Sequence, residues 1–560
     1  MDWLNLHILS ILIWWPVLGA LLLALAPRAA ARQVGLTIAV INFVLSLHLW
    51  RYWHFDAQTP MQFESKVSWL PQLGIYYHLG VDGTSLFLVL LTTFLTPLVM
   101  LSSWKSIQDK VKAFGICLLL LEASAIGVFT ALDLIVFYIF WEAVLIPAYV
   151  LIGLWGGPRR MYAGIKFFMY TMVGSVLMWL AILYLYVVQS SVVSSNLSTS
   201  ILSSGRSFDF ATLRTFGAQL EGTNSSAAQL LFLAFALAFA IKAPLFPFHT
   251  WLPDAYTEAP TGGTIMIAAV LSKMGAYGFL RLAIPMFPAT ALQFAPAIMM
   301  LSTIGIIYGA MVAIAQTDMK RMIAYSSISH IGFIMLGIFG GFAAYQSRNS
   351  TAELASTVAV TGSTLQMFNH GISIAALFLL VGILSDRCGT REIGQFGGLA
   401  KVMPRFTIVF WIALFASIGL PGLNGFVGEF LILQGTMEAN FWYAALAAIG
   451  VILGAVYMLR MFGSVMFGEI TNEAHRTVKD LSRRELVVVG LLLAVAVWVG
   501  VAPQPFLYVV GQPSSTVAQM VSRAPSRSRT YNLAVSAPAT RIAPRLALRP
   551  YSPRDSVSAP

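Results

Sequence analysis

Stretches of about 20 residues with almost no charge recur along this chain from Ile8 to Val501, and each is long enough to cross the ~30 Å hydrocarbon layer of a bilayer as an α-helix. Only 10% of the 560 residues are charged and 58% are hydrophobic, whereas ordinary soluble domains carry roughly 25% charged residues. A water-soluble globule of this composition could not cover its surface. The sequence therefore predicts an all-α polytopic membrane protein.

Hydropathy indicates about fourteen transmembrane helices. If the N-terminus lies outside, the cytoplasmic loops carry most of the loop lysines and arginines, and this positive-inside pattern supports that orientation. The opposite loops hold only Lys66, Arg206, Arg214 and Arg348. The expected spans are roughly 8–26, 34–54, 81–101, 113–131, 133–155, 164–188, 228–248, 261–283, 294–315, 322–343, 357–384, 405–432, 440–464 and 485–502.

The segments outside these spans have three different compositions. The first residues, up to His7, hold no cation, so we expect the first span to be retained and not cleaved as a signal peptide. The connections 55–80 and 189–227 are polar and contain Gly, Ser and Pro, which predicts loops or short hairpins. Residues 512–560 are rich in Ser, Pro and Arg and cannot bury a core, so we expect a basic, disordered tail.

Several kinds of chemistry are excluded by the composition and motifs. Cys117 and Cys388 are the only cysteines, and they lie too far apart in the chain for a CxxC metal knuckle or a Cys-ligated iron–sulfur cluster. No GxGxxG or GxxxxGK[ST] motif is present for a nucleotide. The net charge of +11 comes largely from the tail, so it does not indicate nucleic-acid binding. We expect no cofactor and no metal site in this chain.

Several ionisable residues lie inside the predicted spans, where each costs ~2.5–3.5 kcal/mol on insertion scales, and seven of them stand out. Such groups usually face a polar interior and mark a transport path. These seven are two lysines, two histidines and three glutamates, which we take as the candidate site: Glu122, Glu142, Lys242, Lys273, His330, His370 and Glu429.

Each of these residues also has a purely structural interpretation. A single carboxylate can pair with a cation on a neighbouring helix, Lys242 could snorkel to the interface, the histidines could be packing residues, and Glu429 could cap a helix fragment. Lys273 lies too deep in its span to snorkel easily. Because seven such residues recur in one chain, a transport path is the favoured interpretation.

The residue types favour protons as the transported ion. Burial disfavours the charged form of a lysine or a carboxylate, and a neighbour of opposite charge favours it. We therefore expect Glu142 and Lys242 to form an ion pair whose opening lets Lys242 release a proton toward Lys273. Histidines, which titrate near physiological pH, would carry it further. The set lacks the cluster of hard oxygen ligands typical of Mg²⁺ or Ca²⁺; sodium stays open.

Two predicted spans contain helix breakers. Pro244 and Pro247 interrupt IKAPLFPFHTWLPD, and Pro421 with neighbouring glycines interrupts ASIGLPGLNGFVGEF. Unwound helices of this kind are typical of ion sites in transporters built from inverted repeats, although proline kinks can also serve packing alone. The breaks correspond if two five-helix repeats are assumed. We then expect N-terminal helices at 1–110, repeats at 111–285 and 286–466, a last transmembrane helix at 467–511 and the tail at 512–560.

The chain resembles the antiporter-like membrane subunits of respiratory complex I, specifically the M-type chain, over roughly residues 1–510. The motifs that carry the resemblance are FWEAVLIPAYVLIGLWGGPRRMYAGIKFFMYTMVGS, PFHTWLPDAYTEAPTGGTIMIAAVLSKMGAYG, QTDMKRMIAYSSISHIGF and LPGLNGFVGEF. The resemblance implies that Glu142 and Lys242 are a coupling pair, Lys273 a central relay and Glu429 the terminal group. Sister chains and multi-subunit Na⁺/H⁺ antiporters tend to carry lysine at this last position, which favours the M-type.

The resemblance also implies a function. The chain would move protons within a redox-driven NADH–quinone oxidoreductase, with NADH, FMN and iron–sulfur clusters in partner subunits, quinone in the complex, and sister antiporter-like chains among the partners. Two alternatives stay open: a subunit of a Na⁺/H⁺ antiporter driven by an ion gradient, and a structural scaffold that pumps nothing. His249, Asp254 and Glu258 match the family motif but form no HExxH zinc site, and we expect a structural or subunit-contact role for them.

Overall fold

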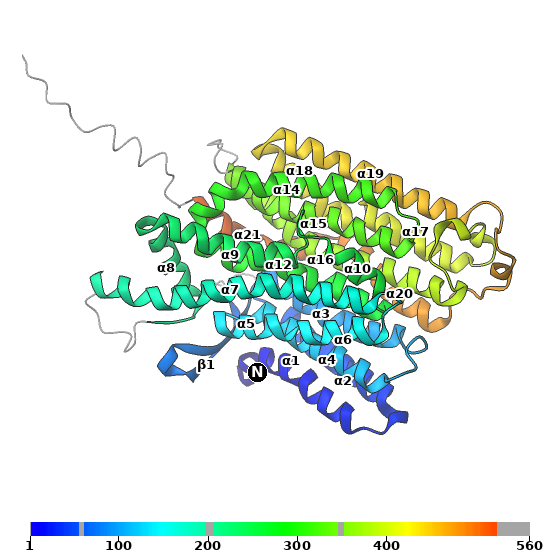
Figure 1. The fold of residues 1–560 in the computed structure, drawn as a ribbon, viewed down its shortest axis with the longest axis horizontal. Coiled ribbons are helices and arrows are strands. Elements are labelled where there is room, and N and C mark those ends of the chain that lie inside the picture. Colours follow the sequence, from blue (N-terminus) through cyan, green and yellow to red (C-terminus); the bar gives the residue numbers. More distant parts are fainter. Residues whose placement is uncertain (1, 55–60, 197–205, 345–351, 523–560) are drawn as a thin grey trace, which may run out of the picture. The chain divides into compact units, whose positions relative to one another are not determined.

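The computed structural model describes residues 2–54, 61–196, 206–344 and 352–522 (Figure 1). Within these ranges thirteen helical segments are long and apolar enough to cross a membrane, and Pro404–Ile418 is a shorter apolar helix. Each of the fourteen predicted spans coincides with one of them. The predicted all-α polytopic fold is therefore confirmed, whereas the division into two repeats stays a prediction.

The helices follow one another along the chain with short connections. The first part contains α1 (Asp2–Leu25), α2 (Ala31–Arg51), α3 (Gly83–Ser102), α4 (Val111–Thr130), α5 (Leu134–Ala143), α6 (Leu145–Trp155), α7 (Arg160–Asn196), α8 (Phe210–Thr223), α9 (Ser225–Lys242), α10 (Trp251–Glu258), α11 (Thr261–Met266), α12 (Ser272–Gly278) and α13 (Ile284–Met286). The second part contains α14 (Pro288–Ile314), α15 (Met319–Ala344), α16 (Ala352–Cys388), α17 (Pro404–Ile418), α18 (Asn424–Ala439), α19 (Phe441–Met466), α20 (Arg483–Val501) and α21 (Gln504–Ser522).

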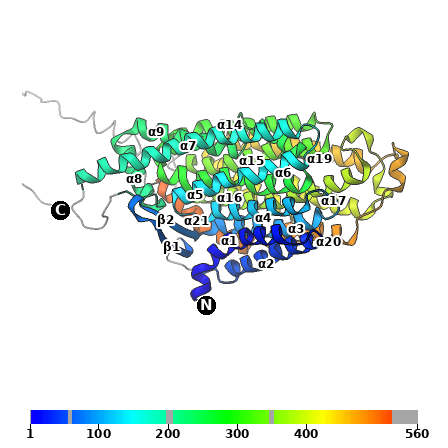
Figure 2. The ribbon, with the colours of Figure 1, turned by 60° about the horizontal axis from the view of Figure 1, so that its bottom comes forward.

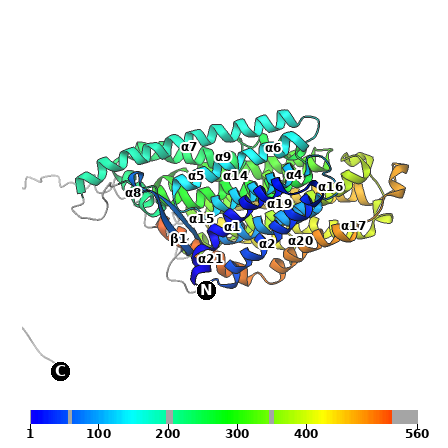
Figure 3. The same cartoon turned by 90° about the horizontal axis from the view of Figure 1, so that it is seen from below.

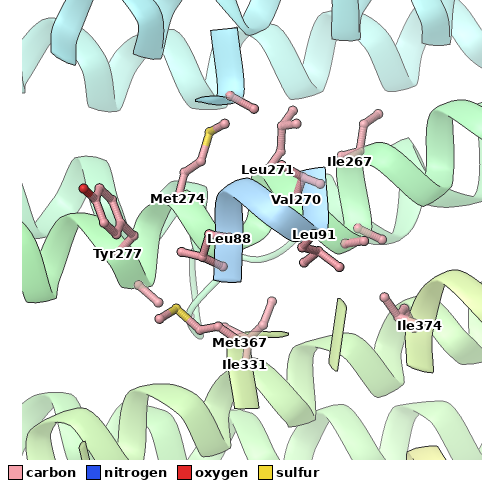
Figure 4. Packing of buried hydrophobic residues seen from close by; sticks show 14 of the residues in the cluster. Leu88, Leu91, Ile267, Val270, Leu271, Met274, Tyr277, Ile331, Met367 and Ile374 are labelled. Atoms are coloured by element: carbon pink, nitrogen blue, oxygen red, sulfur yellow. The ribbon is translucent and has the colours of Figure 1, made fainter. Parts of the chain in front are cut away.

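Helix α16 forms the centre of the helical bundle. Its apolar window is fully buried, whereas that of α19 is only 33% buried, and α7 runs along an edge of the bundle (Figure 3). Side chains from α3, α15 and α16 pack with those of a π-helical segment, η3 (Ile267–Leu271), around Leu88, Val270 and Met367 (Figure 4). The outer helices expose apolar side chains such as Leu180 and Ile452, as helices that face lipid do.

Both predicted helix breaks are present. Helix α9 ends at Lys242 and α10 begins at Trp251, with Pro244 and Pro247 between them. Helix α17 ends at Ile418 and α18 begins at Asn424, and the five residues between them include the left-handed glycines at 419 and 422. Proline removes a backbone donor and glycine accepts a positive φ, so each helix ends at these residues.

A third interruption, which the sequence analysis did not predict, separates α5 from α6 at Val144. Pro147 lies three residues further on and has no N–H to donate to the preceding turn. The interruption directly follows Glu142. Val144 still has helical dihedral angles and its N–H donates to Phe140 O, so α5 and α6 form one membrane-spanning segment with a local irregularity beside this glutamate.

A β-hairpin occupies the first polar connection, as predicted for residues 55–80. Strand β1 (Gln62–Leu70) pairs antiparallel with β2 (Ile75–Val81), and Lys66 lies opposite His78. Residues 55–60 lie outside the described part of the chain. In Figure 2 the hairpin gathers with α8 and α21 at one end of the bundle.

The second polar connection differs from the prediction of loops or short hairpins. Helix α7 continues to Asn196, and α8 occupies Phe210–Thr223, while residues 197–205 lie outside the described part. Asp209 starts α8 by accepting a hydrogen bond from Ala211 N. Leu213, Phe216 and Leu220 repeat at helical spacing and are buried, so the apolar period that forms this helix was present in the sequence.

The predicted start of the tail at residue 512 is wrong, because this residue lies inside helix α21. Helix α21 runs on to Ser522, and its first turns pack against α16 and α3. Phe506 is 3% exposed and contacts Trp50, Phe87 and Phe368. This aromatic anchor stabilises a segment whose Ser and Pro content had suggested disorder. Residues 523–560, the rest of the predicted tail, lie outside the described part.

Candidate functional site

Four of the seven candidate residues form one connected cluster in the middle of the bundle. Lys273 Nζ lies 2.7 Å from His370 Nδ1, and the rings of His370 and His330 are 5.2 Å apart. His330 Nδ1 lies 2.9 Å from Glu429 Oε1. All four residues are buried, with exposed fractions of 8% or less. The cluster joins α12, α16, α15 and α18 in that order.

Lys273 is positioned by an irregular stretch of helix. It lies in α12, which is flanked by the π-helical segments η3 and η4 (Phe279–Ala283), and such segments are frequent at functional sites. Its ammonium group donates to Ala268 O at 2.6 Å and lies 3.2 Å from Ser272 Oγ. With the contact to His370, these bonds satisfy a buried lysine without any carboxylate partner.

His370 contacts Lys273 through one ring nitrogen, Nδ1, and contacts His330 through its ring. An ammonium group can only donate, so Nδ1 accepts from a charged Lys273, and the neutral ring then carries its hydrogen on Nε2. His370 Nε2 is buried and has no hydrogen-bond partner in the described structure. The ring of His330 is the neighbouring titratable group in the direction of Glu429. Among the described residues the two imidazoles are in ring contact with no hydrogen bond between them.

The break between α17 and α18 places Glu429. Glu429 Oε1 accepts a hydrogen bond from Gln366 Nε2 at 3.0 Å as well as contacting His330. Asn369 and Asn424 exchange two hydrogen bonds, each from a side-chain amide to the other's backbone carbonyl, at 2.7 and 2.9 Å. These bonds hold the first residue of α18 against α16 and so fix the distance from the break to the cluster.

Gln366, Asn369 and Asn424 were missed in the sequence analysis, which searched the spans for ionisable residues alone. Amide side chains inside apolar spans are also costly to bury without partners. An inspection of the spans for Asn and Gln would have found all three. Their roles are to orient Glu429 and to anchor the break.

Lys242 and Glu142 do not form the expected ion pair. Within the described residues no salt bridge joins them, and Lys242 Nζ and Glu142 Oε1 are both buried without hydrogen-bond partners. The ammonium group lies over the ring of Trp141 at 4.9 Å from its centroid, a cation–π contact. Trp141 is held in place by a hydrogen bond to Ser175. The aromatic ring, not the carboxylate, is therefore the immediate neighbour of this lysine.

Helices α9 and α12 approach each other closely beside the two lysines. A Cβ placed on Gly275 would overlap the backbone at Phe239 and Ala243. Gly275 lies two residues from Lys273, and Ala243 follows Lys242 directly. The packing therefore brings the ends of α9 and α12 that carry the lysines together, with no direct contact between the lysine side chains.

Glu122 lies apart from the other six residues. It is fully buried in α4, and its Oε1 accepts a hydrogen bond from Asn42 of α2 at 2.9 Å. In the described ranges no hydrogen bond or ion pair joins it to the cluster. The partner is a neutral amide and not the cation of the structural alternative raised for it, and the bond ties α2 to α4.

The polar residues after the first break contact structural neighbours. Asp254 pairs with Lys166 at 2.7 Å, and Glu258 accepts from the backbone of Arg159 at 2.9 Å. The ring of His249 stacks on Phe246. These contacts tie α10 to α7 and fit the expected structural role.

The chain matches two described protein families and several known proteins. "NADH:quinone oxidoreductase/Mrp antiporter, TM" matches residues 131–453, and "NADH-ubiquinone oxidoreductase chain 4, amino terminus" matches residues 13–126. NADH-quinone oxidoreductase subunit M of Rhodobacter capsulatus is 42% identical over 524 residues, which cover 92% of this chain and 96% of that protein. The chain belongs to the M-type, chain 4, family of antiporter-like complex I subunits.

Solved structures agree with this assignment. A chain of respiratory complex I from Thermus thermophilus with bound NADH superposes with a TM-score of 0.78 at 33% identity, covering 92% of this chain and 99% of that one. A chain of the Mrp complex from Dietzia sp. DQ12-45-1b has a TM-score of 0.76 at 20% identity, covering 93% and 99%, and shares the fold. The family resemblance inferred from the motifs is thus confirmed.

Proposed function

We propose that this chain translocates protons across a bacterial inner membrane as the M-type membrane subunit of a redox-driven NADH–quinone oxidoreductase. In this proposal the chain holds no redox group, and NADH, FMN and the iron–sulfur clusters belong to partner subunits, with quinone elsewhere in the complex. Sister antiporter-like chains are its neighbours, and its N-terminus lies on the periplasmic side. Family membership and the buried cluster support the proposal.

The observation that carries the proposal is the continuity of the cluster. Lys273, His370, His330 and Glu429 are each within contact of the next, across four helices and at mid-bundle. A lysine, two imidazoles and a carboxylate can each bind and release a proton. Structural ion pairs need only two partners, so a row of four titratable groups is better explained by proton transfer than by packing.

In our proposal, Lys242 and Glu142 control the delivery of protons to this cluster. Lys242 is buried against Trp141 without a hydrogen-bond acceptor, so its charged state depends on the charges nearby. A change in the charge of neighbouring subunits, transmitted through Glu142, would then shift the proton on Lys242 toward Lys273. The close packing of α9 on α12 at Gly275 supports this direction.

The alternative function is that of a Na⁺/H⁺ antiporter chain driven by an ion gradient. It stays in view because a chain of the Mrp complex has the same fold as this chain. Purification of the native assembly separates the two. Flavin and iron–sulfur signals that are reduced by NADH should copurify with this chain if it belongs to a redox-driven pump. Their absence would favour the antiporter.

The relay is tested by removing one titratable group at a time from the complete complex in liposomes. We expect Lys273→Met and Glu429→Gln each to lower NADH-driven acidification of the liposome interior on the order of 100-fold, the low end of what a positioned proton-transfer group contributes. The measurement is a pH-sensitive dye inside the liposomes, together with NADH consumption and quinone reduction.

Glu221→Gln is the matched control, because Glu221 is a partly buried carboxylate of α8 whose two oxygens accept from the backbone of Ala289 and Thr290, and glutamine retains one of these two acceptors. This variant should pump normally. If Lys273→Met and Glu429→Gln also pump normally, the chain is a scaffold and the proposed relay is wrong.

A further inference from the structure

A largely buried arginine in η4, directly after α12, takes no part in the relay. Arg281 lies eight residues after Lys273, about 12 Å along a helix axis, and its side chain is only 10% exposed. Its Nε donates to Tyr277 Oη at 3.0 Å, and Tyr277 Oη donates to Phe129 O at 2.9 Å. Lys273, Tyr277 and Arg281 thus follow one another at four-residue spacing along one side of the helix.

Asp82 holds the arginine in place. Arg281 Nη2 lies 2.7 Å from Asp82 Oδ1, and the aspartate side chain is 8% exposed. The same oxygen accepts from the backbone N–H groups of Thr84 and Ser85 and so caps α3. Because Asp82 has these other donors, it retains partners when the arginine is removed.

The pair lies between the relay and a cavity. Asp82 and Arg281 line a cavity of ≈ 370 Å³ together with Glu64, His78 and Asp209, at the end of the bundle where the hairpin and α8 gather (Figure 2). The positive-inside pattern predicts this end to be periplasmic. On the opposite side of the pair, Tyr277 belongs to the buried apolar cluster that includes Met274 and Leu88 (Figure 4).

We propose that Arg281 is a charge barrier that stops protons and other cations in the periplasmic cavity from reaching Lys273. A guanidinium group does not deprotonate in proteins, so it keeps its positive charge at every working pH. A fixed positive charge in a narrow polar passage excludes protons and cations in known pores. The inference rests on the proposed function, because a barrier against protons is needed only if Lys273 belongs to a proton relay.

The test is the passive proton leak of the complete complex in liposomes without NADH. A potassium diffusion potential is imposed with valinomycin, and an internal pH dye reports proton influx. We expect Arg281→Gln to raise the leak on the order of tenfold, the scale of one unit charge about 12 Å from Lys273 at an effective dielectric constant of about 20. Arg281→Lys retains the charge and should leak as little as the wild type.

Asp82→Asn separates a charge barrier from a mechanical plug. It breaks the ion pair but leaves the arginine charge, so a charge barrier predicts no added leak, whereas a plug predicts the same leak as Arg281→Gln. The double variant Asp82→Asn with Arg281→Gln removes both charges of the pair and should leak. A leak from Asp82→Asn alone would overturn the proposal.

Two further variants identify the route and the background. Adding Lys273→Met to Arg281→Gln should abolish the leak, because the path runs through that lysine; a persisting leak would overturn the proposal. Arg387→Gln is the matched control, since Arg387 is another partly buried arginine, paired with Glu485 at 2.5 Å. An Arg281→Gln leak no larger than that of Arg387→Gln would also overturn it.

The leak assay is independent of the relay assay. NADH-driven pumping by Glu429→Gln decides the proposed function, and passive leak by Arg281→Gln decides the barrier. Quinone reduction by each variant verifies assembly of the complex, because the redox reaction takes place in other subunits.

Discussion

Gly419 is required at the second helix break for two separate reasons. Its φ of +82° is a conformation that residues with a Cβ avoid. A Cβ at this position would also lie 2.9 Å from Glu429 Oε2. The glycine therefore ends α17 and also leaves room for the carboxylate that terminates the proposed relay.

Gly419→Ala should disturb Glu429, and Gly422→Ala supplies the matched control. Gly422 has a φ of +91° but nothing lies within 4 Å of a Cβ placed there. Both variants should lose about 1–2 kcal/mol of stability from backbone strain, seen as a lower Tm of the purified complex. We expect Gly419→Ala alone to lose most NADH-driven acidification. Equal pumping by the two variants would show that the contact with Glu429 is unimportant.

The residues of the site were predicted better than their contacts. Ionisable residues in apolar segments are conspicuous in a sequence because few can be buried at acceptable cost. Which helices become neighbours is decided by packing across the whole bundle. The cluster from Lys273 to Glu429, the separation of Lys242 from Glu142 and the isolation of Glu122 therefore could not be derived from the sequence alone.

Among the elements, the β-hairpin is attached to the bundle by ionisable groups outside the membrane spans. His78 contacts Asp209 at 2.8 Å through Nδ1 and Glu64 at 2.8 Å through Nε2. Burial alone would lower the pKa of His78, but its hydrogen bonds with the two carboxylates outweigh burial and raise the pKa above 6.5. Burial opposes ionisation of Asp209 too, yet its bonds with His78 and Lys66 hold its pKa well below the usual range.

These shifts predict how the attachment of the hairpin depends on pH. The contribution of His78 is fully present below its unfolded pKa of 6.5 and is lost as the pH rises through the higher folded value. The contribution of Asp209 is present above 3.8 and is lost as the pH falls through its lower folded value. Attachment should therefore be strongest between pH 3.8 and 6.5.

Amide hydrogen exchange of β1 and β2, corrected for intrinsic rates, measures this attachment. Between about pH 6 and about pH 8.5 we expect protection to fall on the order of tenfold, as the loss of a charge-assisted hydrogen bond implies. His78→Gln should abolish this pH dependence. A pH dependence that survives in the variant would assign the effect to other groups.

The elements themselves were largely predictable, and the exceptions have physical causes. A helix in lipid must satisfy its own backbone hydrogen bonds, so an apolar stretch of sufficient length determines it locally. Helices α8 and α21 depend on a few buried residues in polar surroundings, Phe216 in one and Phe506 in the other. The average composition of a segment does not reveal a few such residues. Helix α8 was therefore predicted as a loop, and the end of α21 as part of the tail.

At the scale of the whole molecule, the ion that is moved follows from the groups that the relay contains. Among the described residues no cluster of three or more His, Cys, Asp or Glu side chains is arranged to hold a metal ion. The imidazole and ammonium nitrogens of the row bind protons and are poor ligands for sodium, which prefers oxygen as other hard cations do.

NADH-driven acidification by the complete complex in liposomes should accordingly be the same in sodium-free buffer and in sodium buffer. Radioactive sodium should not cross the membrane when NADH is added. Acidification that requires sodium, or sodium transport that stops in Glu429→Gln, would contradict proton translocation by this chain and favour the antiporter.

Gln366, Asn369 and His370 occupy little more than one turn of α16, yet they bind Glu429, the start of α18 and Lys273 respectively. A rotation of α16 about its own axis would therefore release all three contacts together. Such a turn would separate Lys273 from His370 and free the start of α18, whereas the contact of His330 on α15 with Glu429 on α18 would remain, because neither residue lies on α16.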